Sequence, residues 1–393
     1  MHRITMAGLA GLLSALACAQ DFRDEFTAVT PLNFDAGGAP SRQFHLNAAA
    51  YRFHSTIYRT GETRELEVDL HDDVANAVIR HRDGKSSLAA YVDGDPLLDG
   101  VIILHRGTVV FEAYPHMQPW QRHFAWSVTK VFTATALAAL VREGRVDMQA
   151  PVERYLPTLV DSAWAGTSVQ AVADMASGID CLDSDGYQDS STCIYQLEEA
   201  LGITAPTGRN PELTTQLRGM ERLRPPQTRI EYVSANTVVL GLVIEAVTGQ
   251  SFASTIQALI WDGIGPEADA LVTVSPAGYA YYSGGLSLRL RDLARFGEVF
   301  TRPEEIGVSD ASLLQRMQTA GLERPAEAVS ELTEIFGEDR PRRSAWQWDY
   351  VWPDGALFKH GYDGQGLYVD PGRDLVIAWF GTGLDFNTHT NDM

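Results

Sequence analysis

FAWSVTKVFTATALAALVREG occupies residues 124–144 and joins a polar start to a long run of small and apolar side chains. Alanine and leucine favour a helix over 127–143, and Gly144 is a typical stop. Because 131–141 is apolar or small almost all round, we expect this helix to be buried on every side. Ser127 and Lys130 stand at its first turn.

Ser127 and Lys130 are three residues apart and therefore share one face of the helix. A serine hydroxyl becomes a good nucleophile only when a base takes its proton. Lysine can be that base if its pKa falls from about 10.4 to roughly 7–8. Burial and a first-turn position both disfavour the ammonium, so the pair predicts serine acylation chemistry. Short pairs of this kind also arise by chance.

Lysine is rare in this chain, which has three lysines among 31 basic residues. Arginine replaces lysine as a surface charge but cannot act as a base, so the surviving lysines mark places where an amine is needed. Lys130 and Lys359 both lie in candidate motifs. Lys85 lies in a polar turn, Arg-Asp-Gly-Lys-Ser, and is expected to be an ordinary surface residue.

Composition indicates a folded protein with one large or two medium domains, since 45% of the 393 residues are hydrophobic and 21% are charged. The net charge of −20 argues against nucleic acid or an anionic membrane as the main partner. The first 19 residues predict an export signal with a small-residue cleavage site, and hence a periplasmic or secreted protein. Alternatives are a lipid anchor at Cys18 and a buried N-terminal helix. No other segment is apolar and long enough to be transmembrane.

Removal of the signal would leave Cys181 and Cys193. An oxidising compartment permits a disulfide between them, worth about 3 kcal/mol in the chain-entropy model. Two free buried thiols are the alternative, but the polar, loop-like residues between the cysteines favour the bridge.

Strand signals lie at both ends of the chain. Two β-branched runs at 101–105 and 108–111 predict one hairpin, and 366–370 with 375–380 predict a second. The middle, about 155–275, is rich in helix signals and includes an apolar helix at 236–248. We predict an α/β (α+β) fold with an antiparallel sheet built from both chain ends and a helical insertion. Residues 20–97 carry no motif and are treated as an N-terminal extension of a 98–393 domain.

Two further motifs follow the first in order: Glu-Tyr-Val-Ser-Ala-Asn-Thr at 231–237, before the apolar helix, and Lys-His-Gly-Tyr-Asp-Gly-Gln at 359–365, before a strand. With these, the chain resembles the serine β-lactamase and penicillin-binding superfamily from about residue 98 to the end. It is most similar to class C-like hydrolases, a group that includes esterases and the 6-aminohexanoate-dimer hydrolase. The resemblance implies the β-lactamase/transpeptidase-like fold.

The resemblance also implies roles for individual residues. Ser127 would be the nucleophile, Lys130 its base, and Tyr232 the group that shares the proton and passes it to the leaving group. The backbone N–H groups of Ser127 and Tyr362 would form the oxyanion hole. The substrate-binding residues would be Tyr187, Ser234, Lys359, His360 and Gly361.

Two positions differ from the residues that are commoner in this superfamily: Ser234 stands in place of asparagine, and His360 stands in place of threonine. Both weaken the case for penicillin as substrate. Trp346, Trp348, Tyr350 and Trp352 precede Lys359; they are expected to pack in the core, although a pocket wall is an alternative.

Other hydrolase classes are disfavoured, because the chain has no paired histidine spacing for zinc and no Gly-x-Ser-x-Gly elbow. We expect no metal and no organic cofactor. The sequence therefore predicts an exported serine hydrolase for a small-molecule ester or amide. A β-lactamase or D-alanyl-D-alanine carboxypeptidase is the enzymatic alternative, and a non-catalytic sensor of penicillin or cell-wall fragments is the alternative from another class.

Overall fold

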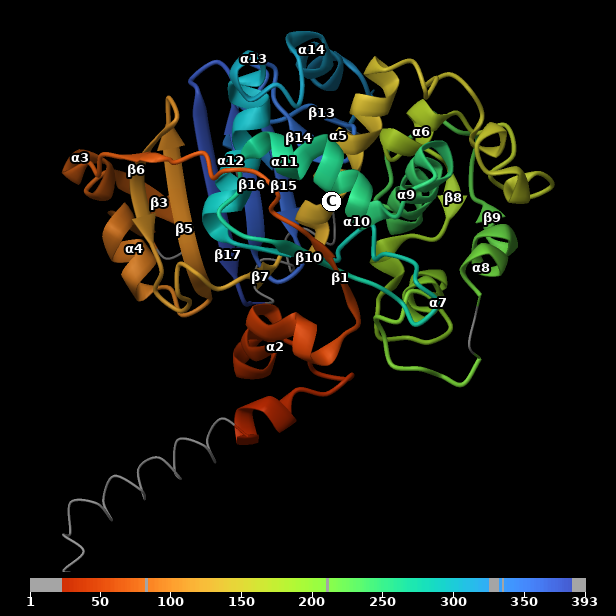
Figure 1. The fold of residues 1–393 in the computed structure, drawn as a ribbon, viewed down its shortest axis with the longest axis horizontal. Coiled ribbons are helices and arrows are strands. Elements are labelled where there is room, and N and C mark those ends of the chain that lie inside the picture. Colours follow the sequence, from red (N-terminus) through yellow and green to blue (C-terminus); the bar gives the residue numbers. More distant parts are fainter. Residues whose placement is uncertain (1–22, 82–83, 210–211, 325–331, 334–335, 384–393) are drawn as a thin grey trace, which may run out of the picture.

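The computed structural model describes residues 23–81, 84–209, 212–324, 332–333 and 336–383. The predicted export signal, with Cys18, lies outside these ranges. Figure 1 shows a large sheet next to a mainly helical region, with the N-terminal segment beneath them.

The main sheet has nine strands in the order β12-β13-β14-β15-β16-β17-β5-β6-β2, and its only parallel pair among the described residues is β2 with β6. The strands are β12 (Leu322–Glu323), β13 (Arg343–Ala345), β14 (Trp348–Val351), β15 (Leu357–Gly361), β16 (Gln365–Asp370), β17 (Leu375–Gly381), β5 (Leu98–His105), β6 (Thr108–Ala113) and β2 (Glu67–Val68). Both predicted hairpins are present. Because β5 pairs with β17, the sheet joins the two ends of the chain, as predicted.

Two buried helices form the centre of the core. The predicted 127–143 helix is realised as a 3₁₀ turn, Trp126–Val128, followed by α5 (Thr129–Arg142), whose residues are buried as far as Leu140. The predicted 236–248 helix begins two residues earlier, as α9 (Ser234–Thr248), and ends at Gly249 with φ +69°. Both helices pack against each other, and Phe132 of α5 stacks on Phe296 at 3.6 Å between ring centroids. Phe296 belongs to α12 (Leu290–Thr301), which covers β16 and β17.

A second sheet of four strands was not anticipated from the sequence. Its order is β1 (His54–Ile57), β10 (Ala270–Thr273), β11 (Leu286–Leu288) and β7 (His123–Phe124). Each strand is short and has at least one partner that is distant in the chain, so no local pattern marks it. The sheet places β7 directly before Ser127 and ties the N-terminal segment to the rest of the molecule.

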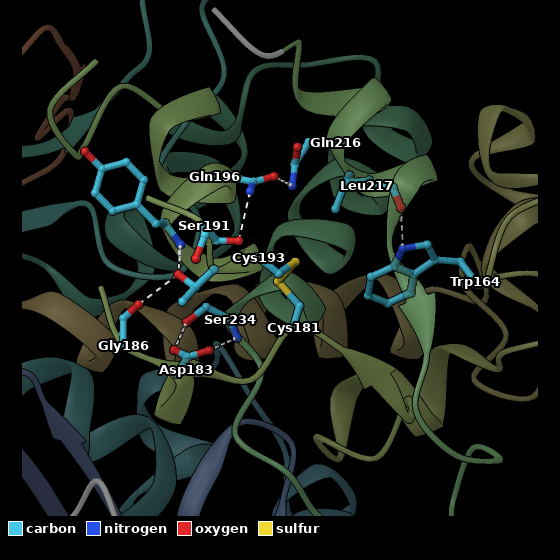
Figure 2. The surroundings of a disulfide bond; sticks show 12 residues. Trp164, Cys181, Asp183, Gly186, Ser191, Cys193, Gln196, Gln216, Leu217 and Ser234 are labelled. Atoms are coloured by element: carbon cyan, nitrogen blue, oxygen red, sulfur yellow. Dashed lines mark hydrogen bonds between the residues drawn. A yellow bond between two sulfur atoms is a disulfide. The ribbon is translucent and has the colours of Figure 1, made fainter. Parts of the chain in front are cut away.

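The middle of the chain supplies the helical region in Figure 1. Its helices are α6 (Val169–Ala173), α7 (Cys193–Ala200), α8 (Leu213–Gly219), α10 (Phe252–Ile256) and α11 (Asp262–Ile264), beside a two-stranded antiparallel sheet of β8 (Ile179–Asp180) and β9 (Glu221–Arg222). Near the large sheet lie α13 (Pro303–Ile306) and α14 (Ala311–Thr319). Cys181 and Cys193 form a disulfide bond that closes the loop before α7 (Figure 2).

Residues before 97 divide into two parts. The helix α2 (Gly38–Tyr51) packs on β7 of the small sheet. The elements α3 (Asp72–Ala75), β3 (Val78–His81), β4 (Gly84–Ser87) and α4 (Leu88–Gly94) lie at the far side of the large sheet, where Val92 packs against Val101 and Ile103. Within the described ranges no single helix is long and apolar enough to cross a bilayer. The helix α9 and the helical segment Phe252–Ile264 reach that length only together, and the chain bends by 79° between them.

Candidate active site

The candidate nucleophile lies in the 3₁₀ turn at the start of α5. Ser127 is partly exposed, whereas the side chain of Lys130 is buried among its neighbours. Lys130 Nζ lies 2.9 Å from Ser127 Oγ and donates to the carbonyl oxygen of Ser283 at 3.0 Å. The amine and hydroxyl therefore meet on one helix face, as the spacing predicted.

Burial lowers the pKa of Lys130 to about 7, because the ammonium loses its hydration. The nearby Lys359 also lowers it, and the carboxylates of Asp183 and Asp349 oppose the effect. A large fraction of Lys130 is thus neutral near pH 7 and able to accept the Ser127 proton.

The phenol of Tyr232 lies between the two buried lysines. Its ring centroid is 5.0 Å from Lys130 Nζ and 4.8 Å from Lys359 Nζ. Lys359 Nζ donates to the Tyr232 oxygen at 3.0 Å. Burial holds the pKa of Tyr232 well above its usual value, and contact with the Ser127 hydroxyl opposes this. Because the Tyr232 oxygen accepts a hydrogen bond from Lys359, its own proton is free to point toward Ser127.

Lys359 is paired with a residue that the sequence did not reveal. Its ammonium, fully buried, contacts both carboxylate oxygens of Asp349, at 2.6 and 2.7 Å. The pair joins neighbouring strands, because Tyr350 of β14 lies opposite Phe358 of β15. His360 and Lys359 hold the pKa of Asp349 below its usual range against the effect of burial. Burial lowers the pKa of Lys359 and the Asp349 carboxylate opposes this effect, so the pair holds the Lys359 amine in place beside Tyr232.

His360 and Gly361 follow at the end of β15. His360 Nδ1 lies 2.5 Å from Asp349 Oδ2, and its backbone N–H donates to the same oxygen at 2.9 Å. Its ring is partly exposed and tilted over Tyr232 at 6.1 Å between centroids. A Cβ on Gly361 would lie 2.8 Å from the carbonyl oxygen of Ala125, so only glycine lets this strand approach the nucleophile turn.

This approach brings Tyr362 to the nucleophile turn. Its ring contacts Trp126 edge to face, with centroids 5.5 Å apart. Ser127 and Tyr362, the two predicted oxyanion-hole residues, therefore belong to backbone segments that lie side by side. The ring of Tyr187 also contacts Tyr362 edge to face, with centroids 5.8 Å apart.

Ser234 and Tyr187 meet at a buried carboxylate, Asp183 (Figure 2 shows Asp183 and Ser234). Asp183 Oδ1 accepts from the Ser234 N–H at 2.7 Å, and Oδ2 accepts from the hydroxyls of Ser234 and Tyr187, each at 2.5 Å. A carboxylate at the first N–H of α9 caps that helix. The Ser234 hydroxyl is thus used within the protein, and Tyr187 is oriented by the same carboxylate.

Two more buried carboxyl groups act on the site. Glu198 on α7 accepts from the Tyr281 hydroxyl at 2.6 Å, and burial raises the pKa of Glu198 to about 8. Burial also raises the pKa of Asp35, in the segment before α2. Among the described residues no group of three or more potential ligands is arranged to hold a metal ion.

Sequence reasoning missed Asp349, Asp183 and Glu198. Asp349 stands inside the run of Trp346, Trp348 and Tyr350, all three of which are buried. A single carboxylate in such an aromatic run was a usable signal, because it needs a buried partner. Asp183 and Glu198 lie in an ordinary polar loop and an ordinary helix, where no local pattern distinguishes them.

Comparison with known sequences agrees with this geometry. The Beta-lactamase family model matches residues 88–392. A 6-aminohexanoate-dimer hydrolase from Paenarthrobacter ureafaciens is 31% identical over 71% of this chain and 71% of its own length. Penicillin-binding protein 4 from Amycolatopsis lactamdurans is 29% identical over 57% of this chain, and the match spans 52% of that protein.

Solved structures share the fold. A proposed 6-aminohexanoate-dimer hydrolase from Bacillus anthracis superposes with a TM-score of 0.73 at 22% identity, covering 93% of this chain and 95% of that one. The penicillin-binding protein homologue from Pyrococcus abyssi gives a TM-score of 0.58 at 20% identity, covering 75% and 72%. The three motifs occur in the order expected for the family, the fold matches, and the family model covers most of the chain. This chain therefore belongs to the Beta-lactamase family, the serine hydrolases of β-lactamase and penicillin-binding type.

Proposed function

We propose that this protein hydrolyses an ester or amide bond through an acyl-enzyme on Ser127. The observation that carries the proposal is the buried Lys130 amine, with its pKa lowered to about 7, at 2.9 Å from Ser127 Oγ. A sensor that only binds its ligand needs no neutral amine at that position, and one that stays acylated needs it once, whereas a hydrolase needs it in each cycle.

In this mechanism Lys130 takes the proton of Ser127 while Oγ attacks the carbonyl carbon. The tetrahedral oxyanion accepts hydrogen bonds from the backbone N–H groups of Ser127 and Tyr362. As the C–N or C–O bond breaks, Tyr232 gives its proton to the leaving group and is reprotonated from Lys130. Water then attacks the acyl carbon with the same groups acting in reverse, which releases the acid and restores Ser127.

An open-chain amide or ester is the substrate class that we propose. The name of the relative at 31% identity supports an amide. The two departures from the commoner motif also support it: the Ser234 hydroxyl is bonded to Asp183 and His360 is held at Asp349, so neither is free to hold a penicillin in the way that asparagine and threonine would.

The test is hydrolysis of p-nitrophenyl acetate and butyrate, followed by a panel of linear amides. Activity should vanish in Ser127→Ala, and a fluorophosphonate label should map to Ser127 by mass spectrometry. Fast turnover of nitrocefin with slow ester cleavage would favour the β-lactamase alternative. Labelling of Ser127 by a penicillin without any turnover would favour the sensor.

We also propose that the protein is exported, because 1–19 has the composition of a signal and the Cys181–Cys193 bridge suits an oxidising compartment. Fusion of 1–25 to a reporter that is active only outside the cytoplasm should give activity. Recovery of the wild-type fusion in the detergent phase, lost in Cys18→Ser, would identify a lipid anchor. A reporter that stays inactive would contradict export.

A further inference from the structure

We propose that His45, on the N-terminal helix α2, is a positioning residue that holds the Ser127 backbone segment of the oxyanion hole through Trp126 and packs against the segment that carries Tyr362. The inference rests on the proposed function. It concerns a buried network behind Ser127 that no step of the mechanism above uses. The network consists of His45, Trp126, Asp363, Thr382, Asp99, His123 and Arg42.

The first link runs to the residue before the nucleophile. Trp126 Nε1 donates to His45 Nε2 at 2.8 Å, and both side chains are buried. Trp126 has φ +43°, a left-handed conformation that a bulky residue adopts only when its surroundings enforce it. The peptide between Trp126 and Ser127 carries the Ser127 N–H, so the backbone angles of Trp126 set where that donor points.

The His45 ring also packs against the residue after Tyr362, without a hydrogen bond to it. Asp363 Oδ2 lies 3.5 Å from the same His45 Nε2 atom, and Asp363 is also left-handed, with φ +66°. Within the described part of the chain neither carboxyl oxygen of Asp363 has a hydrogen-bond partner. One ring nitrogen thus stands between the residues next to both oxyanion donors, each of which holds a conformation rare for a side-chain-bearing residue.

The pKa shifts of His45 and Asp363 are consistent with these contacts. Burial holds the pKa of His45 well below its usual value, so Nε2 keeps the lone pair that the indole N–H requires. Burial holds the pKa of Asp363 well above its usual range, which favours the neutral carboxyl group and lowers the cost of burying it.

A second layer fixes the His45 ring. His45 Nδ1 faces the Thr382 hydroxyl at 3.3 Å, and that hydroxyl donates to Asp99. Asp99 is anchored by Arg42 Nε at 2.6 Å, one turn before His45 on α2. The chain from α2 to the sheet therefore holds the imidazole in one orientation, with Nε2 toward Trp126.

The reason that position matters is geometric. Oxyanion donors act on charge that appears only in the transition state, and a misplacement of about 1 Å costs roughly 100-fold in rate. A loss of alignment lowers kcat and leaves KM nearly unchanged, since the ground-state carbonyl needs these donors less. A merely structural loss would instead lower the amount of folded enzyme.

Two isosteric changes test the proposal. In His45→Gln the side-chain amide reaches the position of Nε2 and can accept from Trp126, whereas in His45→Asn it reaches only the position of Nδ1. We expect His45→Asn to lower kcat for p-nitrophenyl butyrate roughly 10- to 100-fold with KM within about twofold, and His45→Gln to stay within roughly threefold of wild type. The Ki of phenylboronic acid, which forms a tetrahedral adduct on serine, should rise in parallel with the loss in kcat.

Trp126→Phe tests the link from its other end and does not depend on how the His45 variants fold. It should reproduce the loss, and the double variant with His45→Asn should be no slower than either single variant. Trp164→Phe is the matched control, because it removes a buried indole N–H that donates to Leu217 at 3.0 Å away from Ser127 (Figure 2). It should leave kcat per folded enzyme unchanged.

The outcomes separate this inference from the proposed function. If Ser127→Ala keeps full esterase activity, the proposed function fails and the inference fails with it. If activity depends on Ser127 but Trp126→Phe and the folded His45→Asn keep wild-type kcat and boronate Ki, the inference alone is overturned. Equal losses in Trp126→Phe and Trp164→Phe would overturn it as well.

Discussion

At the scale of single residues, the candidate site combines one contact between neighbours in the chain with several contacts between distant residues. The contact of Lys130 with Ser127 follows from a spacing of three on a helix, which is local information. Asp349 and Lys359 meet only through the register of two strands, and His45 reaches Trp126 from a helix 81 residues earlier in the chain. Such contacts depend on tertiary packing, which a single sequence does not display.

Replacement of Lys130 by arginine tests the proton transfer directly. A guanidinium stays protonated at every accessible pH, so Lys130→Arg should lose roughly 10³-fold or more in kcat/KM for p-nitrophenyl butyrate. Lys85→Arg is the matched control and should leave kcat/KM unchanged, because Lys85 lies exposed on β4. Comparable activity in Lys130→Arg and wild type would rule out the amine as the base.

The pH profile reports the same group. The active form is the neutral amine, so kcat/KM should increase about tenfold per pH unit in acid and level off above an apparent pKa near that of Lys130, about 7. Initial rates on a non-ionising ester between pH 5 and 9 measure this limb. A flat profile down to pH 5 would contradict a base with this pKa.

At the scale of elements, strong local patterns were sufficient for the hairpins β5–β6 and β16–β17 and for the helices α5 and α9. The strands β7, β10 and β11 escaped prediction because each has only two to four residues and pairs with a partner far away in the chain. The start of α9 was placed two residues late, since its cap is the distant Asp183 and not an adjacent side chain.

The disulfide loop joins the stability of the helical region to the site, because the loop closed by Cys181 and Cys193 carries Asp183 and Tyr187. The double variant Cys181→Ala/Cys193→Ala should lower the free energy of unfolding by about 3 kcal/mol. It should also raise KM, since Tyr187 and the cap of α9 lose their constraint. Calorimetry and kinetics, with and without reductant, measure both. A wild-type Tm that does not fall under reducing conditions would contradict the contribution of the bridge.

At the scale of the whole molecule, residues before 97 are not a uniform appendage. The part that contains α2 packs behind the nucleophile turn, where Phe44 contacts Phe124 at 5.3 Å and His45 bonds to Trp126. The hairpin of β3 and β4 forms a separate two-stranded sheet. The family match begins at residue 88, so family resemblance alone says nothing about this division.

Changes to these two N-terminal parts should therefore have opposite effects on solubility and activity. Removal of 23–53 would expose the apolar surface around Phe124 and Trp126 and would disconnect β1 from α2. We therefore expect insoluble or inactive protein. Replacement of 78–87 by a short glycine-serine linker removes mainly exposed backbone, and kcat should stay within about twofold of wild type. Both variants are compared with wild type by their soluble yield and by their Ser127-dependent esterase activity. An active 23–53 deletion would show that the catalytic turn holds its shape without α2, against the long-range support inferred for it.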